Sequence, residues 1–571
     1  MKIIRDLTKY FSVLLDWTRG VKRSRVIIAI VVITGAISGF GFTALIAIIN
    51  AALSGRRTPA LIWGFIALCL VIPAAGFASQ ALLIRLTLKS AYNMRMWLSR
   101  RILSAPLRLL EQLGVHRLFA TLTDDIPAVI DGITNLPFLL KQIIIIAGCL
   151  IYLGWLSRPL LLMVLVYMVV GILSYHLPLK RAMRHFRLMR EQWDLLFKAL
   201  RALTEGTKEL KLNRPRRREF LSRHLEPTLK AIQHYGIQGN TLAFAASHWG
   251  LILFFVFIGM AVFGASVFLN VDSQTLTGYT LTVLYLNAPL SAILNAMPNM
   301  SRAYVAFQKI NELSEALGNQ PSEDEGTAEE SSIPPWEHLE LDGVTHTYHH
   351  DGGMHEFTLG PLYINFQPGE LVFVTGGNGS GKTTLAKLIT GLYAPESGEI
   401  RLNGKPTTFQ DRDDYRQHFS VVFSDSYIFE NLLGFEATTL DVKAGDYLTR
   451  LQLNHKVKVE NGALSTINLS QGQRKRLAML TAYLEDRPIY LFDEWAADQD
   501  VMFKEVFYHQ ILPELKARGK MVLVISHDDR YYHVADRIIR LDYGQLVDDQ
   551  RRSHAGTAFG EIQEPAFSTP S

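Results

Sequence analysis

Long apolar stretches in the first 310 residues constrain the fold of this 571-residue chain more than any other feature. Six of them approach or exceed the roughly 20 residues that a helix needs to cross a bilayer. They are approximately Val26–Leu53, Leu61–Leu86, Pro137–Trp155, Leu160–Leu177, Ala243–Leu269 and Thr277–Met300. Core helices of a large soluble domain are the alternative, but 49% hydrophobic residues and a mean hydropathy of +0.13, averaged over a polar C-terminal half, argue against it. The pattern predicts an all-α transmembrane domain of six helices.

Lysine and arginine are distributed unevenly around these stretches. The segment before the first stretch is rich in them, as are the second-to-third and fourth-to-fifth connections. The other connections hold little more than Arg56, Arg57 and Arg158. Because basic segments stay on the cytoplasmic side, the chain is predicted to have both ends in the cytoplasm. The net charge of +5 then reflects topology, so we expect no nucleic-acid partner.

Composition divides the remainder of the chain. Residues 314–335 are acidic and almost free of apolar side chains, which predicts a solvated linker. Residues 551–571, with scattered Gly, Pro, Ser and Thr, predict a disordered tail. We therefore expect a transmembrane domain over residues 1–313 and a soluble α/β domain over residues 336–550. Both cysteines, Cys69 and Cys149, fall within apolar stretches, so a disulfide framework and a soluble cysteine nucleophile are excluded.

A glycine-rich segment in the soluble domain predicts a P-loop. The run Leu371–Thr375 reads as a buried strand, and it leads directly into Gly376, Gly377, Asn378, Gly379, Ser380, Gly381, Lys382, Thr383 and Thr384. Glycines let backbone N–H groups curl around phosphate oxygens, while the lysine reaches the β- and γ-phosphates and the hydroxyl after it binds Mg²⁺. An apolar helix pattern at Leu385–Leu392 favours this interpretation over a chance glycine-rich turn. The chain is therefore expected to bind a nucleoside triphosphate with Mg²⁺.

Two carboxylates end a second apolar strand, predicted over Ile489–Glu494. In phosphoryl transfer the first carboxylate, Asp493, holds Mg²⁺, and the adjacent Glu494 polarises the attacking water. A third strand, Met521–Ile525, is followed by His527. This histidine could donate a hydrogen bond to the γ-phosphate, although a single histidine at a strand end is often only a surface residue.

Together these motifs resemble the nucleotide-binding domain of an ABC transporter, an α/β P-loop ATPase, and the resemblance spans essentially the whole chain. The most specific motif is Leu469-Ser470-Gln471-Gly472-Gln473, which differs from the family signature LSGGQ only at Gln471. Ser470 is also suited to start a helix whose N-terminus faces an anion. P-loop proteins in general lack this signature.

The resemblance implies roles for individual residues. Tyr348 would stack on adenine, Lys382 and the P-loop amides would hold phosphate, and Thr383 and Asp493 would position Mg²⁺. Glu494 would be the general base, His527 the switch histidine and Asp500 the end of the D-loop. The chain has no internal repeat, so the resemblance implies a homodimer in which the signature of one subunit contacts ATP held by the P-loop of the other. Lys382, Glu494 and His527 are the predicted catalytic residues.

One departure from the family pattern follows the predicted strand Phe419–Phe423. Most ABC domains place there a glutamine that senses Mg²⁺ and the membrane domain, whereas this chain has Ser424. Ser424 keeps a hydroxyl ligand but loses the reach of the amide, so either Asp425 or water fills the gap, or nucleotide and membrane domain are coupled less tightly. This substitution and the runs Asp493–Asp500 and Glu205–Leu212 resemble the bacterial branch that exports cyclic peptides.

The resemblance implies an ATP-driven, alternating-access exporter in the bacterial inner membrane, with short coupling helices near Pro106–Thr123 and Arg201–Lys211. Its cargo would be a cyclic or modified peptide such as a siderophore precursor, a lipopeptide or a microcin. A lipid or lipopeptide flippase shares every nucleotide motif, and an ABC ATPase that regulates a membrane partner is a further alternative. The implied partners are a second copy of the chain, the cargo and membrane lipids.

Polar residues recur every four positions in the last apolar stretch, at Asn287, Ser291, Asn295 and Asn299. This spacing places four polar groups along one side of a helix. They either line a water-filled cavity for the cargo or hold helices together. His248 and Gln142 are further candidates for a cavity wall.

Overall fold

The computed structural model describes residues 24–318, 334–348 and 357–552, apart from positions 57, 265–271, 410 and 436. Contacts divide the chain into two units. One comprises Met1–Leu103 with Val115–Asn319, and the other comprises Ser104–Gly114 with Gln320–Ser571. Arg551, the first residue of the predicted tail, is the last residue of strand β12 (Gln545–Arg551), and helix α12 (Ser273–Ala316) continues into the predicted linker. Residues 553–571 of the predicted tail and 319–333 of the predicted linker lie outside the described residues.

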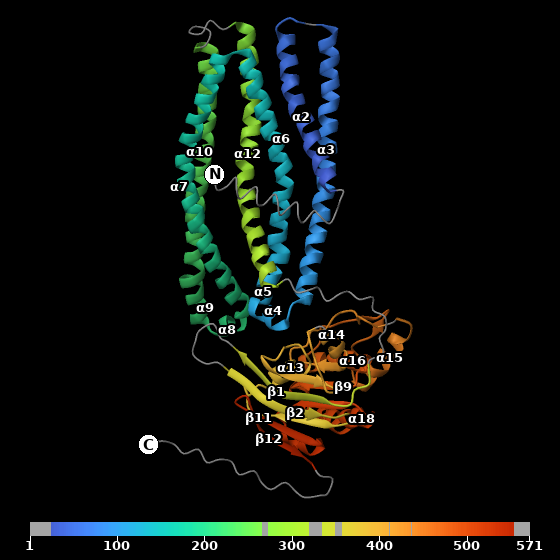
Figure 1. Cartoon of the computed structure of the whole chain (residues 1–571). Helices are drawn as coiled ribbons and strands as arrows, with labels where there is room; N and C mark the ends of the chain where they lie inside the picture. Colours follow the sequence, from blue (N-terminus) through green and yellow to red (C-terminus); the bar gives the residue numbers. More distant parts are fainter. Residues whose placement is uncertain are drawn as a thin grey trace. The chain divides into compact units, whose positions relative to one another are not determined.

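Long helices make up the first unit (Figure 1). They are α2 (Ser24–Leu53), α3 (Pro59–Ser104), α6 (Ile126–Leu156), α7 (Arg158–Glu205), α10 (Glu226–Gly259), which continues as η3 (Met260–Gly264), and α12 (Ser273–Ala316). Helix α6 packs against α12 and α2, while α7 and α10 pack against each other. Most of α3 is exposed in the single chain.

Five helical segments among the described residues are long and apolar enough to cross a membrane. The fourth predicted span, Leu160–Leu177, lies in α7, where the apolar segment found, Arg158–Gly171, is shorter than a span. Six spans therefore remain a prediction. The helices also continue beyond the apolar stretches: α7 has 48 residues and α3 has 46. At about 1.5 Å per residue each is about 70 Å long, more than twice the hydrocarbon core.

Short helices join the long ones. Between α3 and α6 are α4 (Leu107–Leu113), α5 (Val115–Ala120) and η1 (Thr121–Asp125). Between α7 and α10 are α8 (Thr207–Leu212), α9 (Arg214–Glu219) and η2 (Phe220–Leu225). The segments predicted to contain coupling helices therefore include α4 and α8.

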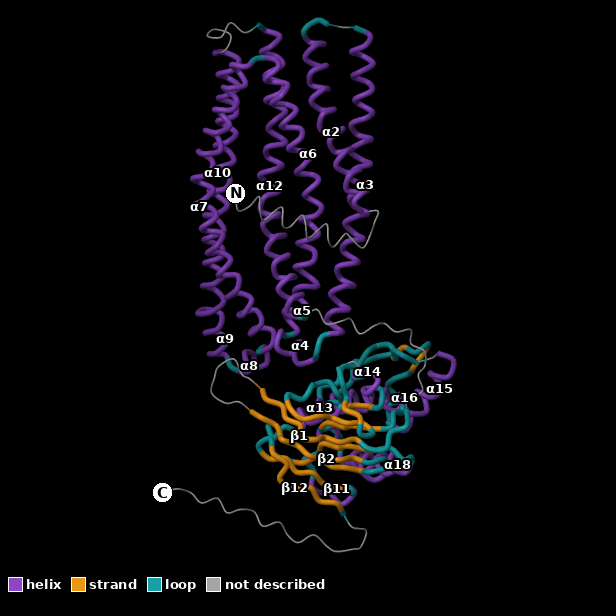
Figure 2. Tube along the Cα trace, viewed as in Figure 1, coloured by secondary structure: helices purple, strands orange, loops and turns teal. Residues whose placement is uncertain are grey.

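The second unit is built around two sheets (Figure 2). The larger has the strand order β12-β11-β3-β10-β9-β6, and all its strands are parallel except β12. Its bounds are β3 (Leu371–Thr375), β6 (Phe419–Val422), β9 (Ile489–Asp493), β10 (Met521–Ile525), β11 (Arg537–Asp542) and β12 (Gln545–Arg551). Strands β3, β9 and β10 are buried along their whole length, which explains their continuous apolar runs. The predicted bounds of β3 and β10 are confirmed, whereas β9 ends one residue earlier than predicted because Glu494 has a left-handed backbone, with φ 47°.

The smaller sheet is antiparallel, with the order β2-β1-β4-β5. Its strands are β1 (Leu339–Tyr348), β2 (Phe357–Phe366), β4 (Ser397–Leu402) and β5 (Lys405–Pro406), and a separate hairpin is formed by β7 (Val459–Glu460) and β8 (Ala463–Leu464). The helices of this unit are α13 (Lys382–Ile389), α14 (Arg412–Arg416), α15 (Ala437–Arg450), α16 (Gln471–Glu485), η4 (Trp495–Asp498), α17 (Val501–Val506), η5 (Phe507–Ile511), α18 (Leu512–Ala517) and η6 (Asp529–Val534).

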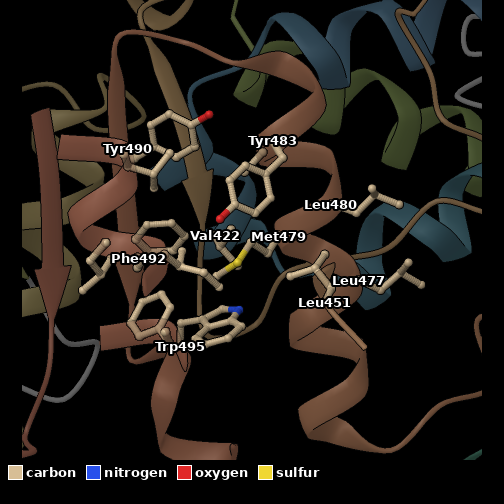
Figure 3. Packing of buried hydrophobic residues seen from close by; sticks show 14 of the residues in the cluster. Val422, Leu451, Leu477, Met479, Leu480, Tyr483, Tyr490, Phe492 and Trp495 are labelled. Carbon is tan, nitrogen blue, oxygen red and sulfur yellow. The ribbon is translucent and has the colours of Figure 1, made fainter. Parts of the chain in front are cut away.

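Strand β9 is packed on both faces. Tyr490 and Phe492 belong to one hydrophobic cluster, which includes Met479 of α16 and Trp495 (Figure 3). Ile489 and Leu491 of β9 belong to a second cluster on the other face of the sheet. Because side chains alternate along a strand, both faces anchor β9. The two carboxylates that follow its apolar residues are therefore held at a fixed position.

Helix α4 is part of the second unit, although it precedes the rest of that unit by more than 200 residues in sequence. Arg108 Nη1 donates to Glu396 Oε1 over 2.7 Å. Glu111 accepts a hydrogen bond from Lys387 Nζ over 2.8 Å and another from the hydroxyl of Tyr393. These polar contacts hold both turns of α4 against the rest of the second unit.

Candidate functional site

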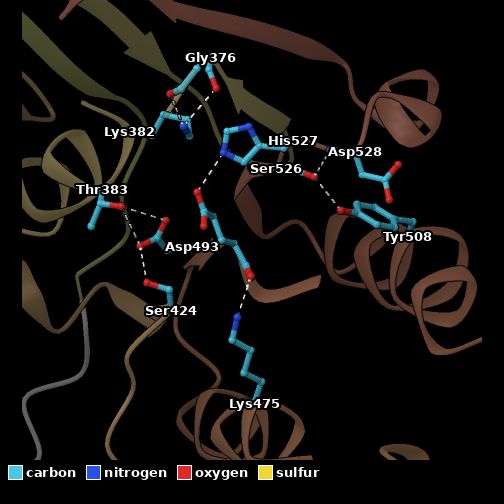
Figure 4. Close-up of polar contacts among 12 residues, drawn as sticks. Gly376, Lys382, Thr383, Ser424, Lys475, Asp493, Tyr508, Ser526, His527 and Asp528 are labelled. Atoms are coloured by element: carbon cyan, nitrogen blue, oxygen red, sulfur yellow. Dashed lines mark hydrogen bonds and ion pairs between the residues drawn. The ribbon is translucent and has the colours of Figure 1, made fainter. Parts of the chain in front are cut away.

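The carboxyl ends of four neighbouring strands bring the predicted site residues together. Strands β3, β10, β9 and β6 are parallel neighbours, and they are followed by the P-loop, His527, Glu494 and Ser424 respectively. In open α/β sheets the carboxyl edge is where ligands bind. Figure 4 shows Lys382, His527 and Ser424 converging there around Asp493.

The P-loop holds its lysine with its own backbone. Lys382 Nζ donates to the carbonyl oxygens of Gly376, over 3.1 Å, and Gly377, over 2.9 Å. Burial lowers the pKa of Lys382, whereas the carboxylates of Glu494 and Asp493 act in the opposite direction. Ser380 has a buried hydroxyl without a hydrogen-bond partner among the described residues. An unsatisfied hydroxyl and a buried ammonium fit a phosphate group, which would supply acceptors to both.

Asp493 lies at the centre of an oxygen cluster and is fully buried. Thr383 Oγ1 donates to its Oδ2 over 3.2 Å, and Ser424 Oγ donates to the same oxygen over 3.5 Å. Burial raises the pKa of the Asp493 carboxyl, and the hydrogen bond from Thr383 opposes that rise. A carboxylate with two hydroxyls is an all-oxygen donor set, which fits Mg²⁺.

Glu494 and His527 form a contact beside this cluster. His527 Nε2 lies 3.0 Å from Glu494 Oε1. The backbone N–H of Glu494 donates to the carbonyl of Ile525 over 3.1 Å, which ties the ends of β9 and β10 together. The neighbouring Ser526 is hydrogen-bonded to the buried hydroxyl of Tyr508 over 2.8 Å (Figure 4). The histidine therefore follows a backbone segment that is fixed on both sides.

The signature begins helix α16, as the sequence predicts for Ser470. Ser470 and Gln473 form a capping box: the serine Oγ accepts from the Gln473 N–H over 3.5 Å, and Gln473 Oε1 accepts from the Ser470 N–H over 3.3 Å. Gly472 allows a close approach, because a Cβ there would lie 2.6 Å from the carbonyl oxygen of Asp498. Within the described part of the chain, no hydrogen bond or ion pair joins the signature to the P-loop.

Ser424 and Gln471, the two residues that depart from the family pattern, both border a cavity of about 300 Å³. Its polar lining residues are Ser424, Asp425, Ser426, Gln471, Arg474 and Lys475. A polar space of this size can hold several water molecules. Asp425 borders this cavity beside Ser424, and the replacement of the glutamine by Asp425 or water stays a prediction.

Sequence reasoning missed Lys475. Its Nζ donates to the carbonyl oxygen of Glu494 over 2.9 Å and lies 2.7 Å from Asp498 Oδ2. A lysine in the second turn of a polar helix reads as a surface residue, and nothing in the local pattern shows that it is buried.

Tyr348, the predicted adenine contact, ends strand β1. It remains 36% exposed, and its hydroxyl accepts a hydrogen bond from Thr384 of α13 over 3.4 Å. Its ring centroid lies 5.2 Å from that of His346. The tyrosine is thus attached to the helix that follows the P-loop while keeping exposed ring surface.

The predicted cavity residues belong to the first unit, and the structure does not bring all of them together. The four residues of the α12 stripe, Asn287, Ser291, Asn295 and Asn299, are all exposed in the single chain. His248 on α10 is exposed and Gln142 on α6 is half-buried. No hydrogen bond among the described residues joins Gln142 or His248 to the stripe.

Known protein families match both halves of the chain. The ABC transporter family profile matches residues 359–497, and that of the ABC transporter transmembrane region matches residues 25–290. The ATP-binding protein SyrD of Pseudomonas syringae pv. syringae is 35% identical over 90% of this chain and 93% of its own length. An ATP-dependent lipid A-core flippase of Dechloromonas aromatica is 27% identical over 84% of this chain and 82% of its own length. The transport/processing ATP-binding protein ComA of Streptococcus pneumoniae is 28% identical over 49% of this chain and 39% of its own length. This multi-pass membrane protein therefore belongs to the ABC transporter family and couples ATP hydrolysis to transport.

Proposed function

We propose that this chain exports a cyclic or modified peptide across the bacterial inner membrane as a homodimer with six spans per subunit and cytoplasmic termini. The hydrolytic part of the proposal rests on one observation: Lys382, Asp493, Glu494 and His527 meet at one edge of the parallel sheet. The peptide cargo rests on the resemblance of the Ser424 and Asp493–Asp500 regions to the cyclic-peptide branch.

Each group at this edge has a role in the proposed hydrolysis. Lys382 would exchange its contacts with the P-loop carbonyls for phosphate oxygens. Thr383, Ser424 and Asp493 would hold Mg²⁺, which when bound supplies positive charge that stabilises the transferring phosphoryl group. Glu494 would accept the proton of the attacking water on its carboxylate. His527, 3.0 Å from that carboxylate, would orient it.

The proposed homodimer is supported by the separation of signature and P-loop within one chain. A site that needs both motifs is completed by a second copy, as the family resemblance implies. In the membrane unit α3 exposes large apolar side chains along its length, including Trp63, Leu70 and Phe77. These can be covered by lipid or by the partner subunit.

A lipid or lipopeptide flippase is the second candidate function, because one extensive relative is named a lipid A-core flippase. Its identity of 27% is lower than the 35% of SyrD. The exposed amides of the α12 stripe favour a polar cargo over a lipid chain, since amides match the hydrogen-bonding groups of a peptide backbone. A regulatory ABC ATPase without cargo is the third candidate.

The test is ATP turnover of the protein in liposomes, measured with cyclic peptides, siderophore precursors and lipids. Glu494→Gln is the inactive control, because the amide cannot accept the proton from water; we expect turnover to fall by about 10²-fold or more. Saturable stimulation by one peptide class, lost in Asn295→Leu but retained in Leu294→Ala at the neighbouring exposed position, would support peptide export. Stimulation by lipids alone would favour the flippase, and robust turnover that no compound changes would favour regulation.

A further inference from the structure

A buried lysine stabilises the backbone of the proposed base. Lys475 is 7% exposed, and its ammonium is shared between the Glu494 carbonyl oxygen and the Asp498 carboxylate. Glu494 adopts φ 47°, in the left-handed region that side chains other than glycine disfavour. Lys475 therefore holds a turn that backbone preference alone opposes, and this turn sets the direction of the Glu494 side chain.

The same carboxylate is bound by the signature. Gln471 Nε2 donates to Asp498 Oδ2 over 3.0 Å, and that oxygen is also the ion-pair partner of Lys475. Gln471 stands where the family signature has a glycine, which has no side chain to make this bond. The substitution in the signature thus creates a direct connection between the signature and the turn that carries Glu494.

A second connection runs parallel to the first. Gln499 Nε2 donates to the carbonyl oxygen of Gly472 over 3.0 Å, and Arg476 Nε donates to Gln499 Oε1 over 2.8 Å. Arg476 also pairs with Asp500 and lies over the ring of Phe503. The Gln471–Asp498 contact and the Gln499–Gly472 contact together hold the start of α16 in a fixed position relative to residues 494–500.

We propose that Lys475 and Asp498 are positioning residues that orient Glu494 for proton transfer, and that Gln471 couples this orientation to nucleotide bound at the signature. The proposal rests on the role proposed above for Glu494 as the base. In the homodimer each signature faces the ATP held by the partner. Binding there acts through Gln471 and Asp498 on the base that serves the chain's own ATP, so the two sites hydrolyse ATP with positive cooperativity.

The first test removes the ammonium of Lys475 and compares the effect with removal of the ammonium of Lys520, a lysine with similar contacts. Lys520 Nζ donates to the carbonyl oxygen of Asp486 over 2.8 Å and lies 3.0 Å from its carboxylate, and Asp486 also has a left-handed backbone, with φ 48°. Lys475→Met and Lys520→Met therefore remove the same kind of contact, one beside Glu494 and one remote from it. We expect comparable losses of melting temperature in both variants.

Only Lys475→Met should lower kcat, by about 10²-fold, because a misplacement of about 1 Å at the reacting group has an effect of that order. The KM for ATP should stay within about twofold, since the ground-state contacts of the P-loop are unchanged. Equal kcat values for the two variants, or a loss confined to KM, would overturn the positioning role.

The second test addresses the connection to the signature. Gln471→Gly restores the family residue at an exposed position and keeps Ser470 and Gly472, so the fold is not at risk. We expect the Hill coefficient for ATP to fall but to stay above 1, because the second connection through Gln499 remains. Asp498→Ala should have the same effect, and adding Gln471→Gly to it should change nothing further, because the shared acceptor is already gone.

Additive effects of the two substitutions, or an unchanged Hill coefficient in Gln471→Gly, would overturn the coupling. The outcome is distinguishable from failure of the base itself. If Glu494→Gln retains turnover, the base assignment fails. If Glu494→Gln abolishes turnover while Lys475→Met behaves like Lys520→Met, only the positioning role fails.

Discussion

Helix α4 provides a quantitative prediction about how firmly this short helix is held on the rest of the second unit. Glu111→Ala removes the acceptor of two hydrogen bonds, one from the buried Tyr393 hydroxyl and one from Lys387. A charge-assisted hydrogen bond contributes about 1.5 to 3 kcal/mol, and an exposed ion pair contributes at most about 1 kcal/mol. Because the Glu111 side chain is 42% exposed, we take the lower values and expect α4 to lose about 2 kcal/mol.

This loss corresponds to about a 30-fold increase in the local opening of α4. Hydrogen–deuterium exchange of a peptide covering Leu107–Leu113, followed by mass spectrometry in nanodiscs, measures it directly. Tyr393→Phe should produce about half the free-energy change, since the ring remains packed and only the hydroxyl is lost. The double variant with Glu111→Ala should not exceed Glu111→Ala alone.

The matched control is Glu205→Ala, which removes an ion pair of 2.8 Å with Arg201 at the exposed end of α7. Both of its side chains are at least 60% exposed, so exchange at that helix end should increase by no more than about threefold. If α4 exchange in Glu111→Ala also rises by less than about threefold, the polar contacts of α4 do not hold it in place and the reasoning is refuted.

Three further predictions concern the ATPase domain. Gly381→Ala should abolish ATP binding measured with a fluorescent ATP analogue, because the residue has φ 100° and a Cβ would lie 2.9 Å from Leu359 Cδ1; unchanged affinity would contradict this. Arg537→Ala should lower the free energy of unfolding by about 2 kcal/mol in chemical denaturation, because it removes the charge-assisted hydrogen bonds of a buried guanidinium to Asp549 and to the carbonyl oxygen of Asn365; a loss under about 0.5 kcal/mol would contradict it. Asp500 accepts a hydrogen bond from the backbone N–H of Phe503, and this bond lowers the pKa of the Asp500 carboxyl. The stability that the carboxylate contributes is therefore complete above its ordinary pKa of about 4 and is lost as the pH falls through the lowered pKa. Asp500→Ala should therefore be less stable than the wild type at pH 7 and converge with it in acid, as tryptophan fluorescence will show; a constant difference would contradict the assignment.

The parts that could be predicted from sequence are those in which local pattern and chemistry coincide. Strands β3, β9 and β10 are short apolar runs that end in glycine, carboxylate or Ser-His residues, so their bounds, to within one residue, and the site at their ends could be read directly. The full lengths of α3 and α7 could not, because their polar continuations have no membrane signal. Burial of Lys475 depends on residues about 20 positions later in the chain, which no local pattern reveals.

The position of α4 in the sequence has a consequence for biosynthesis. Glu111 and its partner Tyr393 are 282 residues apart, so the ribosome completes α4 long before its docking surface exists. At roughly 5 to 20 residues per second, the helix waits about 15 to 60 s for this surface. During that interval its apolar and charged side chains are available to chaperones, to the other short helices and to neighbouring nascent chains. The order of synthesis thus makes α4 reach its final partners long after it is made.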